Sequence, residues 1–122
     1  TTLFRSEEPD LVHIRIVGDL LVSDLEVFYP ILQRRAEGRD RQLWLMEMAE
    51  AGTMTAESRR YSAGWVPRLR IGATAMIHVG FEQRIVTKML TSVYRLFGVM
   101  DFPLNFFDDE ASARAWLESQ RR

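Results

Sequence analysis

The feature that most constrains this fold is the alternation of two hydrophobic periods along the chain. Residues 11–17 alternate apolar and polar side chains, which is typical of a half-exposed strand. Residues 43–48 and 73–79 are almost wholly apolar, as expected for strands covered on both faces of a parallel sheet. Two shorter runs, residues 3–5 and 104–107, are further candidate strands.

The segments between these runs have helical spacing. A capping-box pattern at residues 23–26 begins the first helix, and Gly38 suits its end. Pro30 lies inside this helix and should kink it or mark a restart. Three more helices are expected, over residues 56–66, 82–97 and 110–120.

The remaining short segments read as connections. Gly18 and Asp19 should turn the chain, residues 52–55 should form a loop, and Pro67 should close the second helix. Asp108 or Asp109 should cap the last helix, which should bury Ala113, Trp116 and Leu117.

Strands that alternate with helices predict an α/β fold with a mainly parallel sheet. We expect four or five strands and about four helices in a single domain over residues 1–122, since a chain of this length has room for one core. Right-handed crossovers then place the helices on both faces of the sheet or largely on one.

Composition excludes several classes of function. Sixteen basic residues stand against seventeen acidic ones, so no positive field attracts nucleic acid. The absence of cysteine removes disulfides, thiolate metal sites and thiol nucleophiles. The longest uncharged stretch, residues 71–81, is too short to span a bilayer. No signal-peptide pattern opens the sequence, so a cytoplasmic protein is expected.

The candidates for catalysis are few. His13 and His78 are the two histidines, and each falls inside an expected strand, where His78 reads first as a buried, hydrogen-bonded residue. His78 lies near the carboxyl end of its strand, where open sheets place their sites. Glu47 and Glu50 could act as an acid–base pair. No phosphate loop, serine elbow or paired-histidine metal motif is present, so we expect no enzyme, metal or cofactor.

The second helix and the segment after it carry a group of arginines. Arg59, Arg60, Arg68 and Arg70 could bind a phosphate or an acidic partner, or form a solvated flank.

Aromatic and methionine residues are numerous for so small a core. Tyr61, Trp65, Met89, Tyr94 and Phe97 could line an apolar cleft or a dimer face once the core is filled. The helix over residues 82–97 is apolar over more than one narrow stripe. That breadth favours a second contact surface and a homodimer.

The order of these pieces resembles the STAS-like superfamily, most closely its SpoIIAA-like branch. The likeness covers nearly all of the chain. It rests on Val-Gly-Asp-Leu at residues 17–20, the capped first helix, the strand over residues 43–48, and Phe-Phe-Asp-Asp-Glu-Ala at residues 106–111 followed by Ala-Trp-Leu at residues 115–117. The resemblance implies a four- or five-stranded sheet with its helices mostly on one side.

Relatives of the anti-sigma-factor antagonist type dock on a regulatory kinase and are switched by phosphorylation of a serine at the start of the second helix. That serine belongs to an Asp-Ser-Ser-Gly-like motif, which is absent here, since residues 53–58 read Thr-Met-Thr-Ala-Glu-Ser. Ala56 and Glu57 fall where the serines would be. Thr55 and Ser58 are the remaining candidates for a phosphorylation switch, Glu57 could act as a fixed negative charge, and Thr55 also reads as a plain N-cap.

Two functions follow as hypotheses. The first is a non-enzymatic regulatory domain, a homodimer that binds a protein partner such as a kinase-type anti-sigma factor. Its surface would combine residues 53–58, the 61–70 segment and the exposed part of the third helix, with contacts from Thr53, Glu57, Arg59, Arg60 and Arg68.

The second hypothesis is a carrier of a lipid or other apolar ligand, a role that the resemblance to SpoIIAA-like proteins also implies. Its pocket would lie between the second and third helices. The walls would come from Trp65, Met89, Val93 and Phe97, with Tyr61 beside them.

Overall fold

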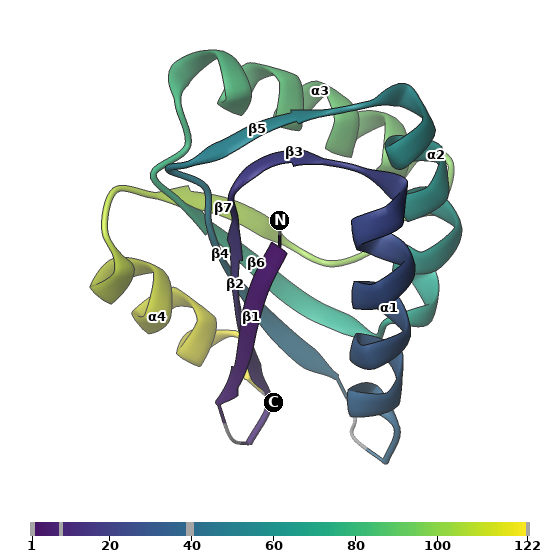
Figure 1. The fold of residues 1–122 in the computed structure, drawn as a ribbon. Coiled ribbons are helices and arrows are strands. Elements are labelled where there is room, and N and C mark those ends of the chain that lie inside the picture. Colours follow the sequence, from purple (N-terminus) through teal and green to yellow (C-terminus); the bar gives the residue numbers. More distant parts are fainter. Residues whose placement is uncertain (1, 8, 39–40, 122) are drawn as a thin grey trace.

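Five strands form a mixed sheet in the order β1-β2-β4-β6-β7 (Figure 1). The computed structural model describes residues 2–7, 9–38 and 41–121. Its strands are β1 (Thr2–Glu7), β2 (Leu11–Ile16), β4 (Gln42–Glu47), β6 (Ile71–Ile77) and β7 (Leu104–Phe107). The edge strand β1 runs antiparallel to β2, and every other neighbouring pair in this sheet is parallel. The predicted α/β class with a mainly parallel sheet is therefore confirmed.

In the described residues three helices connect the strands and a fourth follows the last strand, close to where periodicity predicts them. They are α1 (Val22–Ala36), α2 (Ala56–Trp65), α3 (Phe81–Leu96) and α4 (Glu110–Ser119), with a short 3-10 turn η1 (Val66–Arg68) after α2. Figure 1 shows α1 and α2 on one side of the sheet and α4 on the other, while α3 runs across the outside of the molecule beside β5. The expectation that helices cover mostly one side holds for α1 and α2 but not for α4.

A second, two-stranded sheet corrects two predictions. The segment expected to turn the chain at Gly18 forms strand β3 (Gly18–Leu20), and the expected loop over residues 52–55 largely forms strand β5 (Ala51–Met54). The two strands pair in parallel, and Gly18 N also donates a hydrogen bond to Glu50 O at 2.9 Å. Both segments are too short and too polar to show a strand period, so only tertiary pairing reveals them.

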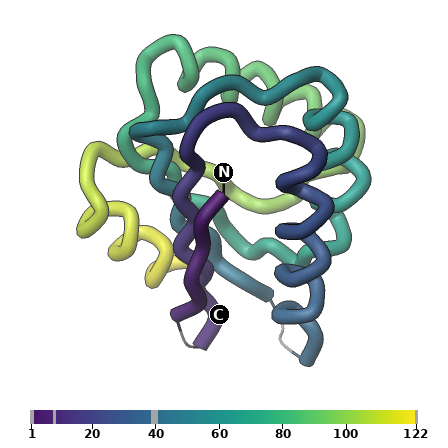
Figure 2. Tube along the Cα trace, in the orientation of Figure 1, coloured from purple at the N-terminus to yellow at the C-terminus, as the bar shows by residue number. Residues whose placement is uncertain are grey.

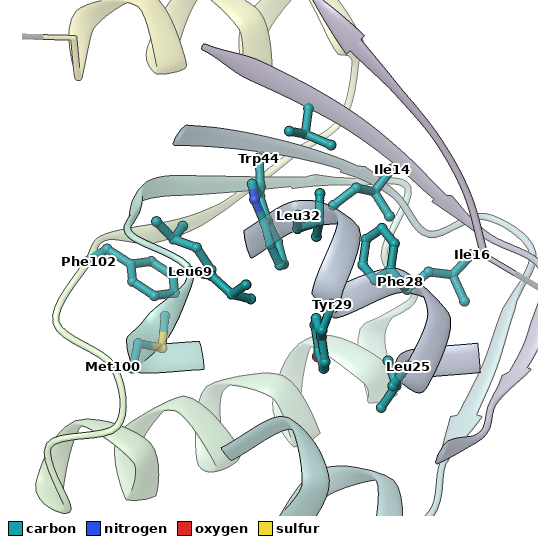
Figure 3. Close-up of a cluster of buried hydrophobic side chains, with 12 residues drawn as sticks. Ile14, Ile16, Leu25, Phe28, Tyr29, Leu32, Trp44, Leu69, Met100 and Phe102 are labelled. Atoms are coloured by element: carbon teal, nitrogen blue, oxygen red, sulfur yellow. The ribbon is translucent and has the colours of Figure 1, made fainter. Parts of the chain in front are cut away.

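The larger core lies between the sheet and α1 with α2. Figure 3 shows Phe28 and Leu32 of α1 directed toward Ile14 and Trp44 of the sheet, while Tyr29 points away from the sheet. The Phe28 ring packs at a tilt against Trp44, with centroids 6.2 Å apart, and against Tyr29, with centroids 5.7 Å apart. The alternation in residues 11–17 works as predicted, because even-numbered residues of β2 enter this core.

The smaller core lies under α4. Ala113 and Leu117 of α4 are fully buried against the odd-numbered residues of β4 and β6, among them Leu45 and Ala75. Trp116 packs against this core and on Phe107, at 5.5 Å between ring centroids, but it is only half-buried, so the burial predicted for it is partial. Asp109 caps α4 as predicted, since its side chain accepts a hydrogen bond from Ser112 N at 2.7 Å.

The start of α1 also differs from prediction. Leu21, not Ser23, is the N-cap residue, and Asp24 reaches back so that its Oδ2 accepts a hydrogen bond from Leu21 N at 3.1 Å. The helix continues through Pro30 without a restart. It ends at Ala36, and Gly38 follows with φ +77°, which favours glycine.

No helix in the described part of the chain is both long enough and apolar enough to cross a membrane.

Candidate partner-binding surface

The β3–β5 ribbon fixes the segment that leads into α2. Asp19 Oδ1 accepts hydrogen bonds from Thr53 N at 2.9 Å and from Thr53 Oγ1 at 3.2 Å. Gly52 permits this close approach, because a Cβ atom there would come within 2.3 Å of Asp19 Oδ1 and 3.0 Å of Asp19 N. Thr53 is therefore exposed but held in one place.

Thr55 begins α2 as its N-cap. Its Oγ1 accepts a hydrogen bond from Ser58 N at 3.0 Å and lies 3.0 Å from Ser58 Oγ. The side chain of Thr55 is exposed, whereas Ser58 is fully buried. Of the two residues predicted as phosphorylation candidates, only Thr55 therefore presents its surface to a kinase in this conformation.

The predicted charged contacts lie around the first turns of α2. Glu57 and Arg60 are exposed. Arg59 is half-buried because its Nη1 donates a hydrogen bond to Met54 O at 2.7 Å, which ties the helix to β5. Tyr94 of α3 donates a hydrogen bond to Arg59 O at 3.0 Å. Burial raises the pKa of Tyr94, which the nearby Arg59 partly offsets, so the phenol stays protonated and can donate.

The far end of α2 is aromatic. Tyr61 and Trp65 stack on Tyr29 of α1, with ring centroids 6.4 Å and 5.9 Å apart. The guanidinium of Arg68 lies over the Trp65 ring at 4.4 Å from its centroid. Trp65 therefore packs inward on the larger core, and Arg68 covers its outer side.

The apolar residues predicted on the third helix do not join this cluster. Met89, Val93 and Phe97 are all exposed, and Phe97 is 75% exposed. The predicted apolar pocket between α2 and α3 is not formed by these side chains, because Trp65 faces the core while they face outward. Two open hollows on the surface, of about 320 and 360 Å³, are lined by other residues, among them Arg41 in one and His13 in the other.

The candidate acid–base residues form separate pairs. Glu47 lies 2.7 Å from His78 Nδ1 and also accepts a hydrogen bond from Ala49 N at 2.9 Å. Glu50 pairs instead with Arg15, so the two glutamates do not act together.

The histidines lie apart from each other. The burial predicted for His78 is wrong, because it follows β6 rather than lying within it, is exposed and has φ +58°. His13 is half-buried on β2, beside Arg5, and burial lowers its pKa. Among the described residues no group of three or more histidine and acidic side chains could hold a metal ion.

Two sets of residues in this region were missed by sequence reasoning. Asp19 and Gly52 fix the ribbon, yet in the sequence they read as ordinary turn residues. Phe81 lies one residue before the predicted third helix and extends the exposed apolar side of α3, with an exposure of 79%. The width of the apolar face was a signal for α3, but the sequence does not say which side of a helix faces the sheet.

Two solved structures share this arrangement. A protein of the DUF3478 family with a SpoIIAA-like fold, from Shewanella loihica PV-4, superposes with a TM-score of 0.74 and 18% identity over 96% of this chain and 92% of its own. The anti-sigma factor antagonist SpoIIAA, in its unphosphorylated form, superposes with a TM-score of 0.68 and 13% identity over 97% of this chain and 98% of its own.

No protein-family model and no curated protein matches the sequence. The likeness therefore rests on the arrangement of the elements over nearly the whole chain. The chain has a SpoIIAA-like fold, as its sequence predicts.

Proposed function

We propose that this chain is a non-enzymatic, cytoplasmic regulatory domain that acts by binding a protein partner. Its partner-binding surface comprises Thr53, Thr55, Glu57, Arg60 and Arg68. A similar fold occurs in an anti-sigma factor antagonist, which makes an anti-sigma factor of the kinase type the first partner to test. The domain acts as a homodimer.

The observation that carries this proposal is the rigid attachment of an exposed polar segment. Residues Thr53 to Arg60 are held by Asp19, by the Thr55 cap and by the Arg59–Met54 hydrogen bond. A pre-ordered surface loses little conformational entropy on binding, so ordering the segment reduces the binding free energy only slightly. Arg60 and Glu57, both exposed, supply charges that orient a partner.

A serine switch does not form part of this proposal. Ser58 is fully buried, and the two residues before it are Ala56 and Glu57. Glu57 places a permanent negative charge in the first turn of α2, where a helix N-terminus stabilises it. The domain would therefore bind its partner in one constitutive charge state.

The test is direct binding of the purified chain to each kinase-type anti-sigma factor encoded in the same genome, by titration calorimetry. We expect one of them to bind, and Arg60→Glu to weaken that binding by roughly tenfold or more, as for a charge reversal at the centre of an interface. Arg34→Glu is the matched control, because it makes the same charge change on an exposed part of α1. Absence of binding by every factor overturns the proposed partner.

Incubation of the complex with ATP, followed by mass spectrometry, tests the absence of a serine switch. The chain should remain unphosphorylated both at Ser58 and at the exposed Thr55. Stoichiometric phosphate on Ser58 would show that the helix opens to the kinase, and would contradict the constitutive charge state.

A further inference from the structure

Helix α3 is attached with its apolar side outward. We call this side the outer face of α3; its seven large apolar side chains are all exposed, and they are Phe81, Ile85, Val86, Met89, Val93, Leu96 and Phe97. No residue of α3 itself is buried. Figure 2 shows the helix at the periphery of the molecule, next to β5 and α2.

The inner side of α3 is held by hydrogen bonds and by Tyr94, which packs against the larger core. Gln83 Nε2 donates to Ala51 O at 3.1 Å, Tyr94 donates to Arg59 O, and Arg95 Nη2 donates to Phe102 O at 2.8 Å. Arg84 pairs with Asp108 at 3.3 Å. An amphipathic helix normally buries its apolar side, so this reversed arrangement leaves the outer face exposed, with no cover from the described residues.

The area of the outer face is large for a monomer. If each side chain has a full accessible area of about 150–200 Å², the exposed fractions together leave roughly 700–900 Å² of side-chain surface in water. A typical monomer exposes its largest apolar patch over only about 300–600 Å². Each partner in a standard protein–protein interface buries about 800 Å². The outer face thus has the area of one half of a stable interface.

The order of the side chains on this face is symmetric. Every fourth residue forms one ridge along the helix, namely Phe81, Ile85, Met89, Val93 and Phe97. Read from either end, the ridge runs aromatic, β-branched, methionine, β-branched, aromatic. When two copies lie antiparallel with Met89 opposite Met89, each Phe81 meets a Phe97 and each Ile85 meets a Val93. A two-fold interface requires this kind of self-complementarity.

We propose that the outer face of α3 binds a second copy of this chain, with the two helices antiparallel and Met89 on the two-fold axis. The inference rests on the homodimer included in the proposed function and assigns its interface. It does not depend on the anti-sigma factor partner, whose surface lies at the start of α2. Glu82, the one charged residue on the outer face, lies near the helix end and so at the rim, where interfaces are polar.

The first experiment measures mass in solution by sedimentation equilibrium. We expect the chain to be a dimer at tens of micromolar, and Met89→Asp to raise its dissociation constant by roughly tenfold or more, because it buries a carboxylate at the centre of the interface. Val27→Asp is the matched control, since Val27 is 66% exposed on α1, outside the outer face. It should leave the dimer unchanged.

The second experiment uses the absence of cysteine in the natural sequence. Under mild oxidation, Met89→Cys should cross-link to itself, because a residue on the two-fold axis meets its own copy. Phe81→Cys alone and Phe97→Cys alone should cross-link poorly. An equimolar mixture of these two variants should cross-link well, because the antiparallel arrangement brings residue 81 to residue 97.

The outcomes separate the alternatives. If Met89→Asp leaves the dimer intact, the homodimer is retained but the proposed α3 interface is wrong. Self-cross-linking of Phe81→Cys as efficient as that of Met89→Cys would mean parallel helices and overturn the arrangement. A wild-type monomer that instead co-sediments with anionic phospholipid vesicles would assign the outer face to a lipid surface. If the chain is a monomer and does not bind the vesicles either, self-association is overturned. Binding to an anti-sigma factor is then decided separately, by the calorimetric titration.

Discussion

The phenol of Tyr29 and the hydroxyl of Ser62 lie 2.7 Å apart in the buried contact between α1 and α2. Tyr29 is 5% exposed and Ser62 is 3% exposed, so the two groups satisfy each other where water does not reach. This hydrogen bond joins α1, which supplies four buried residues of the larger core, to α2, which begins the partner-binding surface. Stability and the position of that surface are therefore linked.

Replacement of Tyr29 by phenylalanine should lower the free energy of unfolding by about 1–3 kcal/mol, because it leaves the Ser62 hydroxyl buried without its partner. Urea titration measures this change. Tyr29→Phe combined with Ser62→Ala should cost less than the sum of the two single substitutions, since the pair is removed together. Strict additivity would mean that the two groups do not interact.

Ionisation of the Tyr29 phenol should lower the free energy of unfolding at alkaline pH. Burial raises the pKa of Tyr29 from 10.0 to about 12. The unfolded chain therefore ionises first, and the contribution of the neutral phenol, complete below pH 10, is lost as the pH rises toward about 12. We expect a fall of up to about 1.4 kcal/mol per pH unit in this range. Tyr29→Phe should remove most of this dependence of the unfolding free energy on pH. If the dependence is unchanged in this variant, other titrating groups cause it.

The ion pair between Glu7 of β1 and Arg114 of α4 should stabilise the fold above acidic pH. The guanidinium of Arg114 lowers the pKa of Glu7 from 4.5 to about 2. The stabilisation is present above pH 4.5 and is lost as the pH falls toward about 2. Because the two side chains are 30% and 34% exposed, solvent screening reduces its value to about 1 kcal/mol.

The free energy of unfolding of Glu7→Gln, measured at pH 7 and at pH 2, tests this prediction. The substitution should cost about 1 kcal/mol at pH 7 and nearly nothing at pH 2. Glu26→Gln on the exposed side of α1 is the control and should leave the free energy of unfolding unchanged at both pH values. An equal cost of Glu7→Gln at both pH values would point to a role other than charge.

Gly52 should not tolerate a side chain, whereas Gly64 should. The Cβ atom of Gly52→Ala would clash with Asp19 and separate β3 from β5, at a cost of about 1–3 kcal/mol. Gly64 lies in α2 with no atom within 4 Å of its would-be Cβ, so Gly64→Ala should stabilise by about 0.5–1 kcal/mol. Thermal unfolding of the two variants compares them. Similar effects at both positions would refute the close approach to Asp19.

Thr55 should matter as a helix cap. Thr55→Ala removes the acceptor for Ser58 N and should cost about 1 kcal/mol. Thr55→Asp should keep the stability close to that of the natural chain, because a carboxylate caps a helix and interacts favourably with its N-terminus. Urea titration of both variants tests this. A destabilised Thr55→Asp would mean that the hydroxyl has a further partner.

The sequence predicted the elements well wherever their hydrophobic period was long. The strand over residues 11–17 and the helix over residues 82–97 were each placed to within one or two residues. Short elements were missed, since β3 has three residues and β5 has four, too few to show a period. Thr55 was identified as a cap because the rule for caps is local.

The candidate site was predicted less completely. Arg60 and Glu57 lie on the surface as expected, because charged residues at the exposed positions of a helix stay in water. The burial of Ser58 was not predicted, since it depends on how α2 meets the sheet. Asp19 was not predicted because its partner, Thr53, lies 34 residues away.

The sequence by itself determined the α/β class, the parallel direction of β4 and β6, and the likeness to the SpoIIAA-like fold, because period, capping and order of elements are local properties. Only the tertiary structure decided that the apolar side of α3 faces outward. The amphipathic α3 could have buried its apolar side, yet polar contacts from Gln83, Tyr94 and Arg95 hold it with that side outward. Such an orientation depends on partners distant in the chain, and no local pattern records them.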